Sequence, residues 1–373
     1  MIIAIEAQRI FRINKHGMDF VILEALKRIR EIDKENEYFV FTAGGDDICL
    51  ESTKNMHVIS LKSPSYPLWE QYALAKAVNK LKPDLLHCTS NTAPIFCKVP
   101  LVLTLHDIIF LEKREGASHS LYQNLGRIYR RMVVPRIIPK CKKIITVSNY
   151  ECNRIKEFLH LSPTKITAIY NGYDTHFKPI ENPFSVTSNY LKDKNYLFFL
   201  GNTDPKKNTL RVLEAYSLYL KRSGEKLPLL IADLHAEIAK KIIEKNNLGE
   251  IMPHLRFCGY INNKDLVSIY NGAKVFLYPS LRESFGIPIL EGMASGTPII
   301  TSATSAMPEI AGEGATLIDP LDPETIADAL LKLENDTDYY NSQVKYGLER
   351  VKLFSWDHTA RKMLEVYKEV AGK

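Results

Sequence analysis

The sequence is short of the features that mark membrane-spanning, secreted and zinc-binding proteins. No run of eighteen apolar residues occurs, so no membrane-spanning helix is expected. The segment Met1–Ile5 lacks the basic stretch and cleavage site of a signal peptide, and we expect it to form a first strand. The six cysteines are scattered, without a C-x-x-C pair. These absences favour a reducing cytoplasm and argue against a metal site.

The length of 373 residues, with 45% hydrophobic and 25% charged residues, predicts two sizeable globular domains. The net charge of +6 is concentrated in residues 113–143, where nine lysines and arginines interleave with apolar residues at near-helical spacing. A surface that lies on anionic lipid and a solvated helix with one apolar face in a core both fit this pattern. No nucleic-acid recognition motif accompanies the charge, so no nucleic-acid partner is expected.

Short apolar runs alternate with amphipathic helical segments in both halves of the chain. This alternation predicts parallel sheets covered by helices on both faces. Residues 178–194 contain two prolines and no clear period, and they are interpreted as a linker. We therefore predict an α/β protein with two doubly wound Rossmann-like domains, residues 1–178 and 195–355. The last helix, 356–371, is expected to pack back on the first domain.

The stretch 279–296 carries the strongest local signal for ligand binding. It follows a short buried strand and contains a loop with Glu283 and Gly286, and then a helix that begins near Pro288. Such a helix N-terminus offers free N–H groups and a positive dipole end to an anion, usually phosphate. Glu291, one turn into the helix, can accept hydrogen bonds from ligand hydroxyls. A phosphate beside two carboxylates suggests a nucleotide carrying a sugar, although a purely structural βα turn is the alternative.

Polar residues also follow other predicted strands, and ligands of doubly wound sheets bind beyond the carboxyl ends of strands. His106 and Asp107 come directly after a buried strand, where burial is costly unless the pair is hydrogen-bonded or functional. A hydrogen-bonded structural histidine fits equally well. Lys206 and Lys207 follow another strand, where a lysine can act as a point charge on phosphate. Gly17, before the first predicted helix, is a weaker phosphate signal.

Together these features resemble the glycosyltransferase family 4 group, of GT-B fold, and the resemblance covers essentially the whole chain. It rests on motifs in the same order, namely His106-Asp107, YNGYD at 170–174, GNTDPKKN at 201–208, the pair Glu283 and Glu291, PEIAG at 308–312, and FSW at 354–356. The resemblance implies two domains facing a cleft. It also implies transfer of a sugar from a nucleotide diphosphate donor with retention of configuration, without a metal or other cofactor.

The resemblance also implies roles for individual residues. Lys207 would neutralise the diphosphate, Glu283 would contact the donor sugar, and His106 would reach the sugar from the opposite domain, so these three are the candidate catalytic residues. Glu291 would bind the ribose hydroxyls. The remaining candidate donor-binding residues are Gly17, Asn171, Asn202, Lys206, Arg282, Ser284, Phe285, Gly286 and Ile287.

Two departures from the family pattern concern the phosphate contacts. The family often has an arginine near Asn202 as a second cation, and this chain has none there. Lys206 or Arg282 is expected to compensate, unless the donor is held differently. The loop before the first helix carries one glycine, Gly17, where the family usually has two, and this weakens its assignment to phosphate.

The sequence forms at 205–208 and 287–291 look most like bacterial mannosyl- or rhamnosyltransferases of surface polysaccharide assembly. The favoured donor is GDP-mannose, with a UDP-sugar as the alternative, and the expected acceptor is a glycan or a lipid-linked molecule. A GT-B sugar-nucleotide epimerase and a non-catalytic sugar-nucleotide binder are further alternatives. The expected location is the cytoplasm, with peripheral contact to the inner face of the plasma membrane through residues 113–143.

Overall fold

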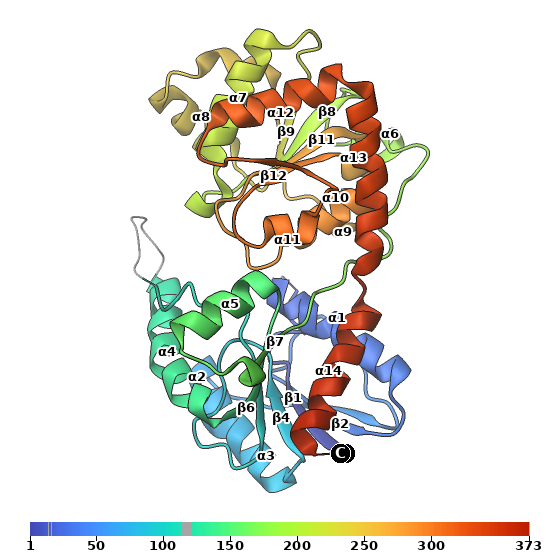
Figure 1. The fold of residues 1–373 in the computed structure, drawn as a ribbon. Coiled ribbons are helices and arrows are strands. Elements are labelled where there is room, and N and C mark those ends of the chain that lie inside the picture. The colour runs from blue at the N-terminus through green and yellow to red at the C-terminus, as the bar shows by residue number, and fades with distance from the viewer. Residues whose placement is uncertain (14, 16, 113–120, 373) are drawn as a thin grey trace. The chain divides into compact units, whose positions relative to one another are not determined.

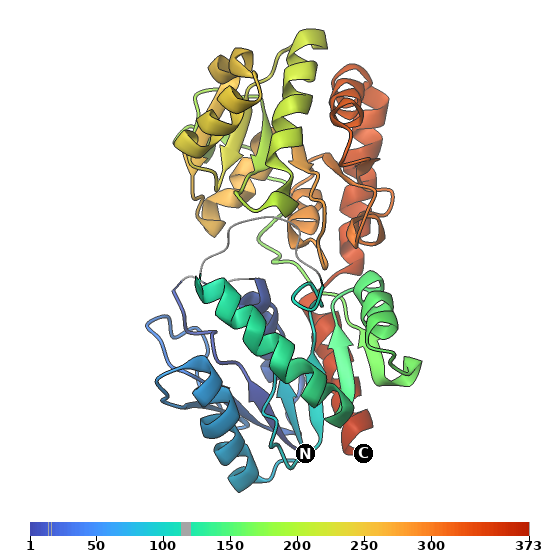
Figure 2. The same cartoon turned by 90° about the vertical axis from the view of Figure 1, so that its left-hand side faces the viewer.

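The chain divides into two compact units, each built on one parallel sheet (Figure 1 and Figure 2). The first unit holds Met1–Gly172 together with Ser355–Lys373, and the second holds Tyr173–Phe354. The computed structural model describes residues 1–13, 15, 17–112 and 121–372. The predicted pair of doubly wound α/β sheets is confirmed.

The sheet of the first unit has seven parallel strands in the order β3-β2-β1-β4-β5-β6-β7. These strands are β1 (Ile2–Glu6), β2 (Glu37–Thr42), β3 (Met56–Ser60), β4 (Leu85–Cys88), β5 (Leu101–Thr104), β6 (Cys141–Thr146) and β7 (Ile166–Ala168). The helices are α1 (Gly17–Ile32), α2 (Tyr66–Leu68), the π-helical η1 (Trp69–Leu74), α3 (Ala75–Leu81), α4 (Leu121–Ile137), η2 (Ile138–Lys140), α5 (Asn149–Phe158), η3 (Pro163–Lys165) and α14 (Trp356–Ala371).

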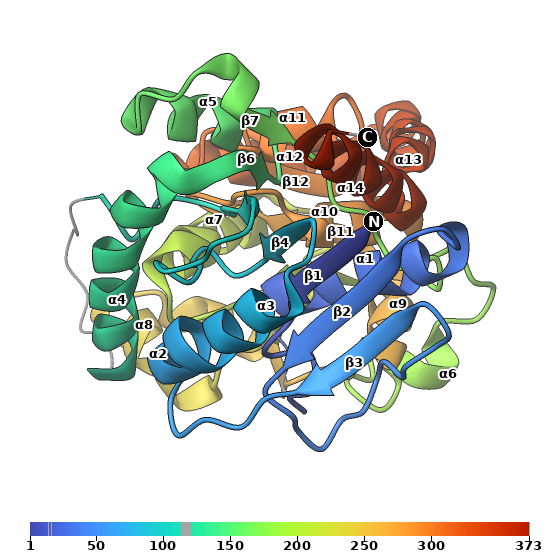
Figure 3. The ribbon, with the colours of Figure 1, turned by 90° about the horizontal axis from the view of Figure 1, so that it is seen from below.

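Alternate residues of the first sheet face two separate helical layers, as the pleat of a strand requires. Ile3 and Ile5 pack with residues of α1 and α14, whereas Ala4 packs with residues of η1, α3 and α4. Figure 3 shows α1 and α14 on one side of this sheet and α2, α3 and α4 on the other. Because both faces are covered, the strands read as nearly continuous apolar runs, which is why their positions could be predicted.

The sheet of the second unit has six parallel strands in the order β10-β9-β8-β11-β12-β13. These strands are β8 (Tyr196–Leu200), β9 (Leu229–Ala232), β10 (Leu255–Gly259), β11 (Ala273–Tyr278), β12 (Ile299–Ser302) and β13 (Thr316–Ile318). The helices are α6 (Phe184–Thr187), η4 (Pro205–Lys207), α7 (Thr209–Arg222), α8 (Ala236–Lys245), η5 (Gly249–His254), α9 (Asn263–Gly272), α10 (Ile287–Ala294), α11 (Met307–Ala311), α12 (Pro323–Asn335), α13 (Thr337–Arg350) and η6 (Val351–Leu353).

The predicted linker, residues 178–194, is grouped with the second unit. Its short helix α6 packs against α9, and Thr187 is buried. The side-chain oxygen of Asn271 accepts a hydrogen bond from the N–H of Ile180 at 2.8 Å. The segment lacks a local period because contacts with α9, distant in sequence, give it its order.

Two further observations concern the chain as a whole. The last helix, α14, lies in the first unit, where it packs on α1. Among the helices that the structure describes, none combines the length and the apolarity needed to cross a bilayer.

Candidate functional site

The carboxyl edge of the second sheet contains a topological switch point between β8 and β11. In doubly wound sheets, ligands bind outside the carboxyl ends of the strands at such a point. β8 leads into η4, which carries Lys206 and Lys207, and β11 leads into the loop that carries Arg282, Glu283 and Ser284. Residues separated by about eighty positions in sequence are therefore brought to one edge of the sheet.

Lys207 and Glu283 form an ion pair at this edge. The ammonium Nζ of Lys207 lies 2.7 Å from Oε1 of Glu283, and it also donates to the hydroxyl of Tyr278 at 3.2 Å. The two side chains are only 21% and 14% exposed, so water screens the pair weakly. Burial disfavours the carboxylate, but the charges of Lys207 and Lys206 outweigh it and hold the pKa of Glu283 below its ordinary value. Glu283 is therefore an anion at neutral pH.

Hydrogen bonds on both sides fix the loop that carries Glu283. On one side, the N–H of Leu281 donates to the carbonyl of Lys206 at 2.7 Å. On the other side, the hydroxyl of Ser305 accepts from the N–H of Glu283 at 3.1 Å and donates to its carbonyl at 2.6 Å. The side-chain amide of Asn208 donates to two carbonyls, one in this loop and one before α12. The loop is thus held in a defined position before any ligand binds, which reduces the cost of ordering it.

The predicted helix N-terminus is present at α10. Gly286 precedes the helix with φ of +102°, Pro288 occupies its first turn, and Gly296 follows it with φ of +75°. Phe285 is buried and its ring lies edge-on to that of Phe354, with centroids 6.0 Å apart. The N-terminus of α10, with the positive end of the helix dipole, therefore follows Glu283 within the same loop, as anion binding requires.

Gly286→Ala tests whether this backbone geometry matters. An added Cβ would lie 3.1 Å from Cδ1 of Ile289, and positive φ is strained for any residue with a Cβ. We expect a loss of about 1–2 kcal/mol in the free energy of unfolding, measured by urea denaturation. Gly249→Ala is the matched control, since its φ is ordinary and no atom lies within 4 Å of the added Cβ. An equal loss in the two variants would contradict this account of Gly286.

Glu291 lies one turn into α10, and Tyr270 of α9 donates a hydrogen bond to its Oε2 at 3.1 Å. Burial raises the pKa of Glu291 to about 7, while the Tyr270 bond and the charge of His176 act in the opposite direction. The carboxyl group is therefore close to half-ionised at neutral pH. A carboxylate of this kind can accept two hydrogen bonds from a pair of vicinal hydroxyls.

Asn202 has a structural role in the turn after β8. Its side-chain oxygen accepts from the N–H of Asp204 at 3.0 Å, and its carbonyl accepts from the hydroxyl of Thr209 at 2.7 Å. The predicted second-unit residues that the structure gathers at this edge are Asn202, Lys206, Lys207, Arg282, Glu283, Ser284, Phe285, Gly286, Ile287 and Glu291.

Three predicted residues, His106, Gly17 and Asn171, belong to the first unit. The backbone N–H of His106 donates to the side-chain oxygen of Asn91 at 2.7 Å. Its Nε2 lies 3.0 Å from the carbonyl of Thr89, which can only accept, so Nε2 carries the hydrogen. Burial lowers the pKa of His106, and the ring is neutral at pH 7.

The other two predicted residues of the first unit, Gly17 and Asn171, lie at the ends of secondary-structure elements. Gly17 is the first residue of α1, and two residues of the loop before it, Asn14 and His16, lie outside the described residues. Asn171 is buried beyond the end of β7, two residues before the division between the units.

Sequence reasoning missed four residues at or near these strand ends. In the second unit, Tyr278, Tyr270 and Ser305 contact the predicted site residues, as described above. In the first unit, Arg9 follows β1, and its Nε lies 2.9 Å from Oδ1 of Asp19 in the first turn of α1. Tyr278 ends the apolar run of β11, which is a usable signal. The partners of the others are set by the sheet order and leave no local pattern.

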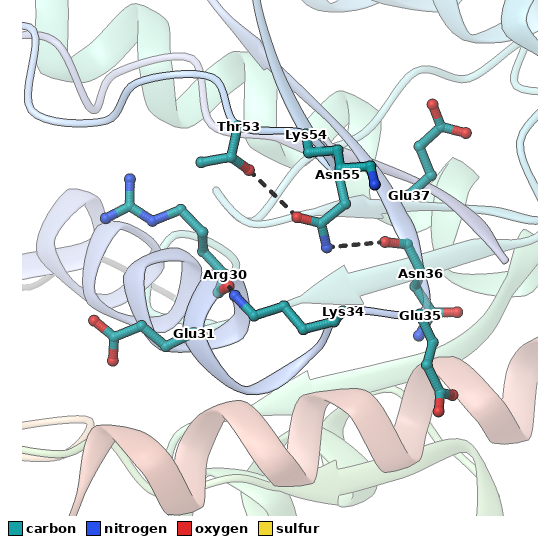
Figure 4. A pocket seen from close by; sticks show the side chains of 9 residues that line it. All are labelled: Arg30, Glu31, Lys34, Glu35, Asn36, Glu37, Thr53, Lys54 and Asn55. Carbon is teal, nitrogen blue, oxygen red and sulfur yellow. Dashed lines mark hydrogen bonds between the residues drawn. The ribbon is translucent and has the colours of Figure 1, made fainter.

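A hollow of the first unit, with a volume of about 580 Å³, lies at the opposite, amino-terminal edge of the sheet (Figure 4). It is lined by the end of α1 and the residues where β2 and β3 begin, and its charges are mixed. The amide of Asn55 donates to the carbonyl of Asn36 at 3.2 Å, and the hydroxyl of Thr53 donates to Asn55 at 3.3 Å. Because its polar groups satisfy one another, this hollow is a weaker candidate than the switch point.

Comparison with known proteins identifies the class of protein that these two units form. Residues 17–177 match the family described as Glycosyltransferase Family 4, and residues 184–350 match the family described as Glycosyl transferases group 1. The chain therefore belongs to the glycosyltransferase family 4 group, has the GT-B fold and is a glycosyltransferase.

Two relatives and one solved structure show how similar this chain is to individual known proteins. O-antigen chain mannosyltransferase B of Escherichia coli is 26% identical over 275 residues, which are 72% of this chain and 70% of the relative. The serotype-specific mannosyltransferase WbdA of Escherichia coli is 26% identical over 306 residues, or 78% of this chain, but the match spans only 37% of its own length. The solved structure of sucrose-phosphate synthase (tll1590) from Thermosynechococcus elongatus has a TM-score of 0.76 at 20% identity. It covers 99% of this chain and 98% of its own, and it supports the fold alone.

Proposed function

We propose that this chain transfers mannose from GDP-mannose to a glycan or lipid-linked acceptor in surface polysaccharide assembly, with retention of configuration and without a metal. The observation that carries the proposal is the Lys207–Glu283 pair beside the N-terminus of α10, with Glu291 one turn further on. Mannose as the transferred sugar is supported by the names of the bacterial relatives.

The mechanism follows from the charge that develops when the sugar departs from the diphosphate. Lys207 and the N–H groups of the first turn of α10 supply positive charge and hydrogen-bond donors to the leaving group, which lowers the barrier. The fixed position of Lys207, held by Glu283 and Tyr278, means that little rearrangement is needed at that moment.

Glu283 is assigned to the donor sugar and not to nucleophilic attack. Glycosidases place two carboxylates on either side of the scissile bond, whereas here Glu283 is ion-paired with the cation assigned to the phosphate. In the proposed reaction the acceptor hydroxyl attacks from the face that the diphosphate leaves, and a diphosphate oxygen takes its proton. The carboxylate of Glu283 would then accept hydrogen bonds from hydroxyls of the sugar while it stays ion-paired with Lys207.

The test is a donor screen with the purified protein. Thermal unfolding is recorded with GDP-mannose, GDP, UDP-glucose and UDP, because a ligand that binds only the folded state raises Tm by mass action. We expect GDP-mannose to stabilise the protein by about 2.7 kcal/mol at a concentration one hundred times its Kd, and the UDP compounds to have little effect. Transfer of labelled mannose to a polyprenyl-linked glycan, measured with and without EDTA, then tests the reaction and its metal independence.

The alternatives give distinct results in the same experiments. Stabilisation by UDP compounds alone would replace GDP-mannose with a UDP-sugar donor. Conversion of the donor to an epimer without acceptor would identify an epimerase, and binding without turnover over a broad acceptor panel would identify a binding protein. Activity that EDTA abolishes and a divalent cation restores would overturn metal independence.

A further inference from the structure

The helix α4 of the first unit has large apolar side chains on its exposed face. Leu125, Ile128 and Met132 are 67%, 54% and 55% exposed, although they follow the spacing of three and four residues that usually marks a buried face. They therefore form a continuous apolar ridge, which we call the α4 ridge. Single exposed apolar residues are ordinary, but a ridge along one helix indicates a contact surface.

The core-facing side of α4 is a different set of residues. Val133, Val134 and Ile137 are buried in the cluster beneath the sheet, and Tyr129 packs edge-on against Tyr66. The helix thus already has a complete inward face. The α4 ridge is additional to it, so burial in the core does not account for these side chains.

Neighbouring elements extend the apolar surface. α4 lies beside α2 (Figure 1 and Figure 3), and Gln71 of η1 donates to the hydroxyl of Tyr129 at 2.8 Å. Leu68 and Tyr72 of this neighbouring segment are more than half exposed. Five large apolar side chains, two of them from a separate stretch of sequence, are therefore exposed on adjacent helices of one unit.

The exposed charges on the described residues of α4 and of its neighbours α2, η1 and α3 have one sign. Arg131, Arg136 and Lys142 are exposed on α4 and just beyond it, and Lys76 of α3 lies over the ring of Tyr72 at 5.9 Å. Residues 121–150 contain no aspartate or glutamate, and residues 64–83 contain a single glutamate, Glu70, which is buried. An apolar ridge with arginines and lysines beside it is the pattern of a helix that lies in the interface of an anionic membrane.

We propose that the α4 ridge and the adjacent exposed face of η1 dock the first unit on an anionic lipid bilayer. The apolar side chains enter the boundary between headgroups and acyl chains, while the arginines and lysines contact the lipid phosphates. In the described residues of α4 and of the neighbouring α2, η1 and α3, the only acidic residue is the buried Glu70, and this favours a negatively charged surface as the partner. The proposal depends on neither the donor nor the transferred sugar.

The test is co-sedimentation of the full chain with vesicles of phosphatidylcholine, alone or with one third phosphatidylglycerol. We expect binding to the anionic vesicles only, weakened between about 0.1 M and 1 M salt as the Debye length falls from ~10 Å to ~3 Å. Leu125→Ser/Ile128→Ser/Met132→Ser should weaken binding at least about tenfold. Each of Arg131→Ala and Arg136→Ala should weaken it about fivefold.

A matched control separates the surface from general loss of apolar residues. Leu321→Ser/Tyr346→Ser/Leu353→Ser removes three exposed apolar side chains from the second unit and should leave vesicle binding unchanged. The melting temperature of each variant confirms folding. Equal binding by the ridge variant and this control would overturn the proposal, as would equal binding to neutral and anionic vesicles. A dimer in light scattering that only the ridge variant dissociates, without vesicle binding by the unaltered chain, would assign the surface to a second copy instead.

Discussion

Lys207→Ala is expected to lower kcat/KM for sugar transfer by about a hundredfold to a thousandfold. The lysine is the cation that we assign to the leaving diphosphate, and removing one preorganised donor to developing charge typically costs this much. Its ammonium is already 2.7 Å from Glu283 and 3.2 Å from the hydroxyl of Tyr278, so its position is set by neighbours and not by the ligand. Steady-state kinetics with GDP-mannose and a lipid-linked acceptor measure the effect.

Two further variants show whether the loss reflects catalysis. Lys207→Arg keeps the charge and should recover part of the activity, although a guanidinium has a different geometry. Lys241→Ala, on the exposed surface of α8, is the matched control and should have full activity. Because Lys207→Ala leaves Glu283 without its cation in a mostly buried position, Tm is measured alongside. A variant that folds and keeps more than about a tenth of the activity would contradict the role of Lys207.

Glu291→Gln is expected to stabilise the protein above neutral pH while weakening its binding of the donor. Burial raises the pKa of Glu291 from 4.5 to about 7, so the folded chain holds an extra proton between these values. The stabilising contribution of that proton is complete below pH 4.5 and is lost as the pH rises through 7. Glutamine is neutral at every pH, so the substitution should raise the free energy of unfolding more at pH 8 than at pH 5. The difference between its effects at the two pH values should be about 2–3 kcal/mol at most.

The donor affinity should move in the opposite direction. If the carboxylate accepts hydrogen bonds from the ribose hydroxyls, the affinity of the unaltered protein falls as the pH drops below about 7. Glu291→Gln should bind the donor about ten to a hundred times more weakly at pH 8 and lose this pH dependence. Urea unfolding and titration calorimetry at both pH values measure the two effects. Glu244→Gln, exposed on α8, is the control, and a pH dependence of donor affinity that survives in Glu291→Gln would assign it to another group.

The expected effects of Glu291→Gln on stability and on donor affinity are opposite in sign. A carboxylate that is costly to bury is retained where a ligand needs it, so stability is given up for binding. Gly286 is different, since its positive φ suits glycine and a residue with a Cβ there should destabilise the fold. Of these two positions, only Glu291 should therefore yield a stabilising substitution.

The sequence by itself determined the elements and the local chemistry of the site. Strands buried on both faces read as apolar runs, and α10 shows its start at Gly286 and Pro288 and its end at Gly296, because these signals depend only on neighbouring residues. The positions of Lys207 and Glu283 after separate strands were therefore predictable. The roles assigned to all of the site residues, Gly17, His106 and Asn171 included, stay predictions.

The tertiary structure alone decided which of these residues meet. The order of the strands places β8 beside β11 and so pairs Lys207 with Glu283, whereas the packing of α9 on α10 brings Tyr270 to Glu291. The same distinction explains the predicted linker, which is ordered by its contacts with α9.

The basic stretch 113–143 shows the distinction most clearly. Its described part, from residue 121 onward, includes α4, and the near-helical spacing of apolar residues was visible in the sequence. Spacing alone does not reveal which of two apolar rows faces the core. Packing against the sheet and η1 turns Tyr129 and Val133 inward and leaves Leu125, Ile128 and Met132 in water. Periodicity is a property of the segment, whereas the direction a face points is set by what the rest of the chain packs against it.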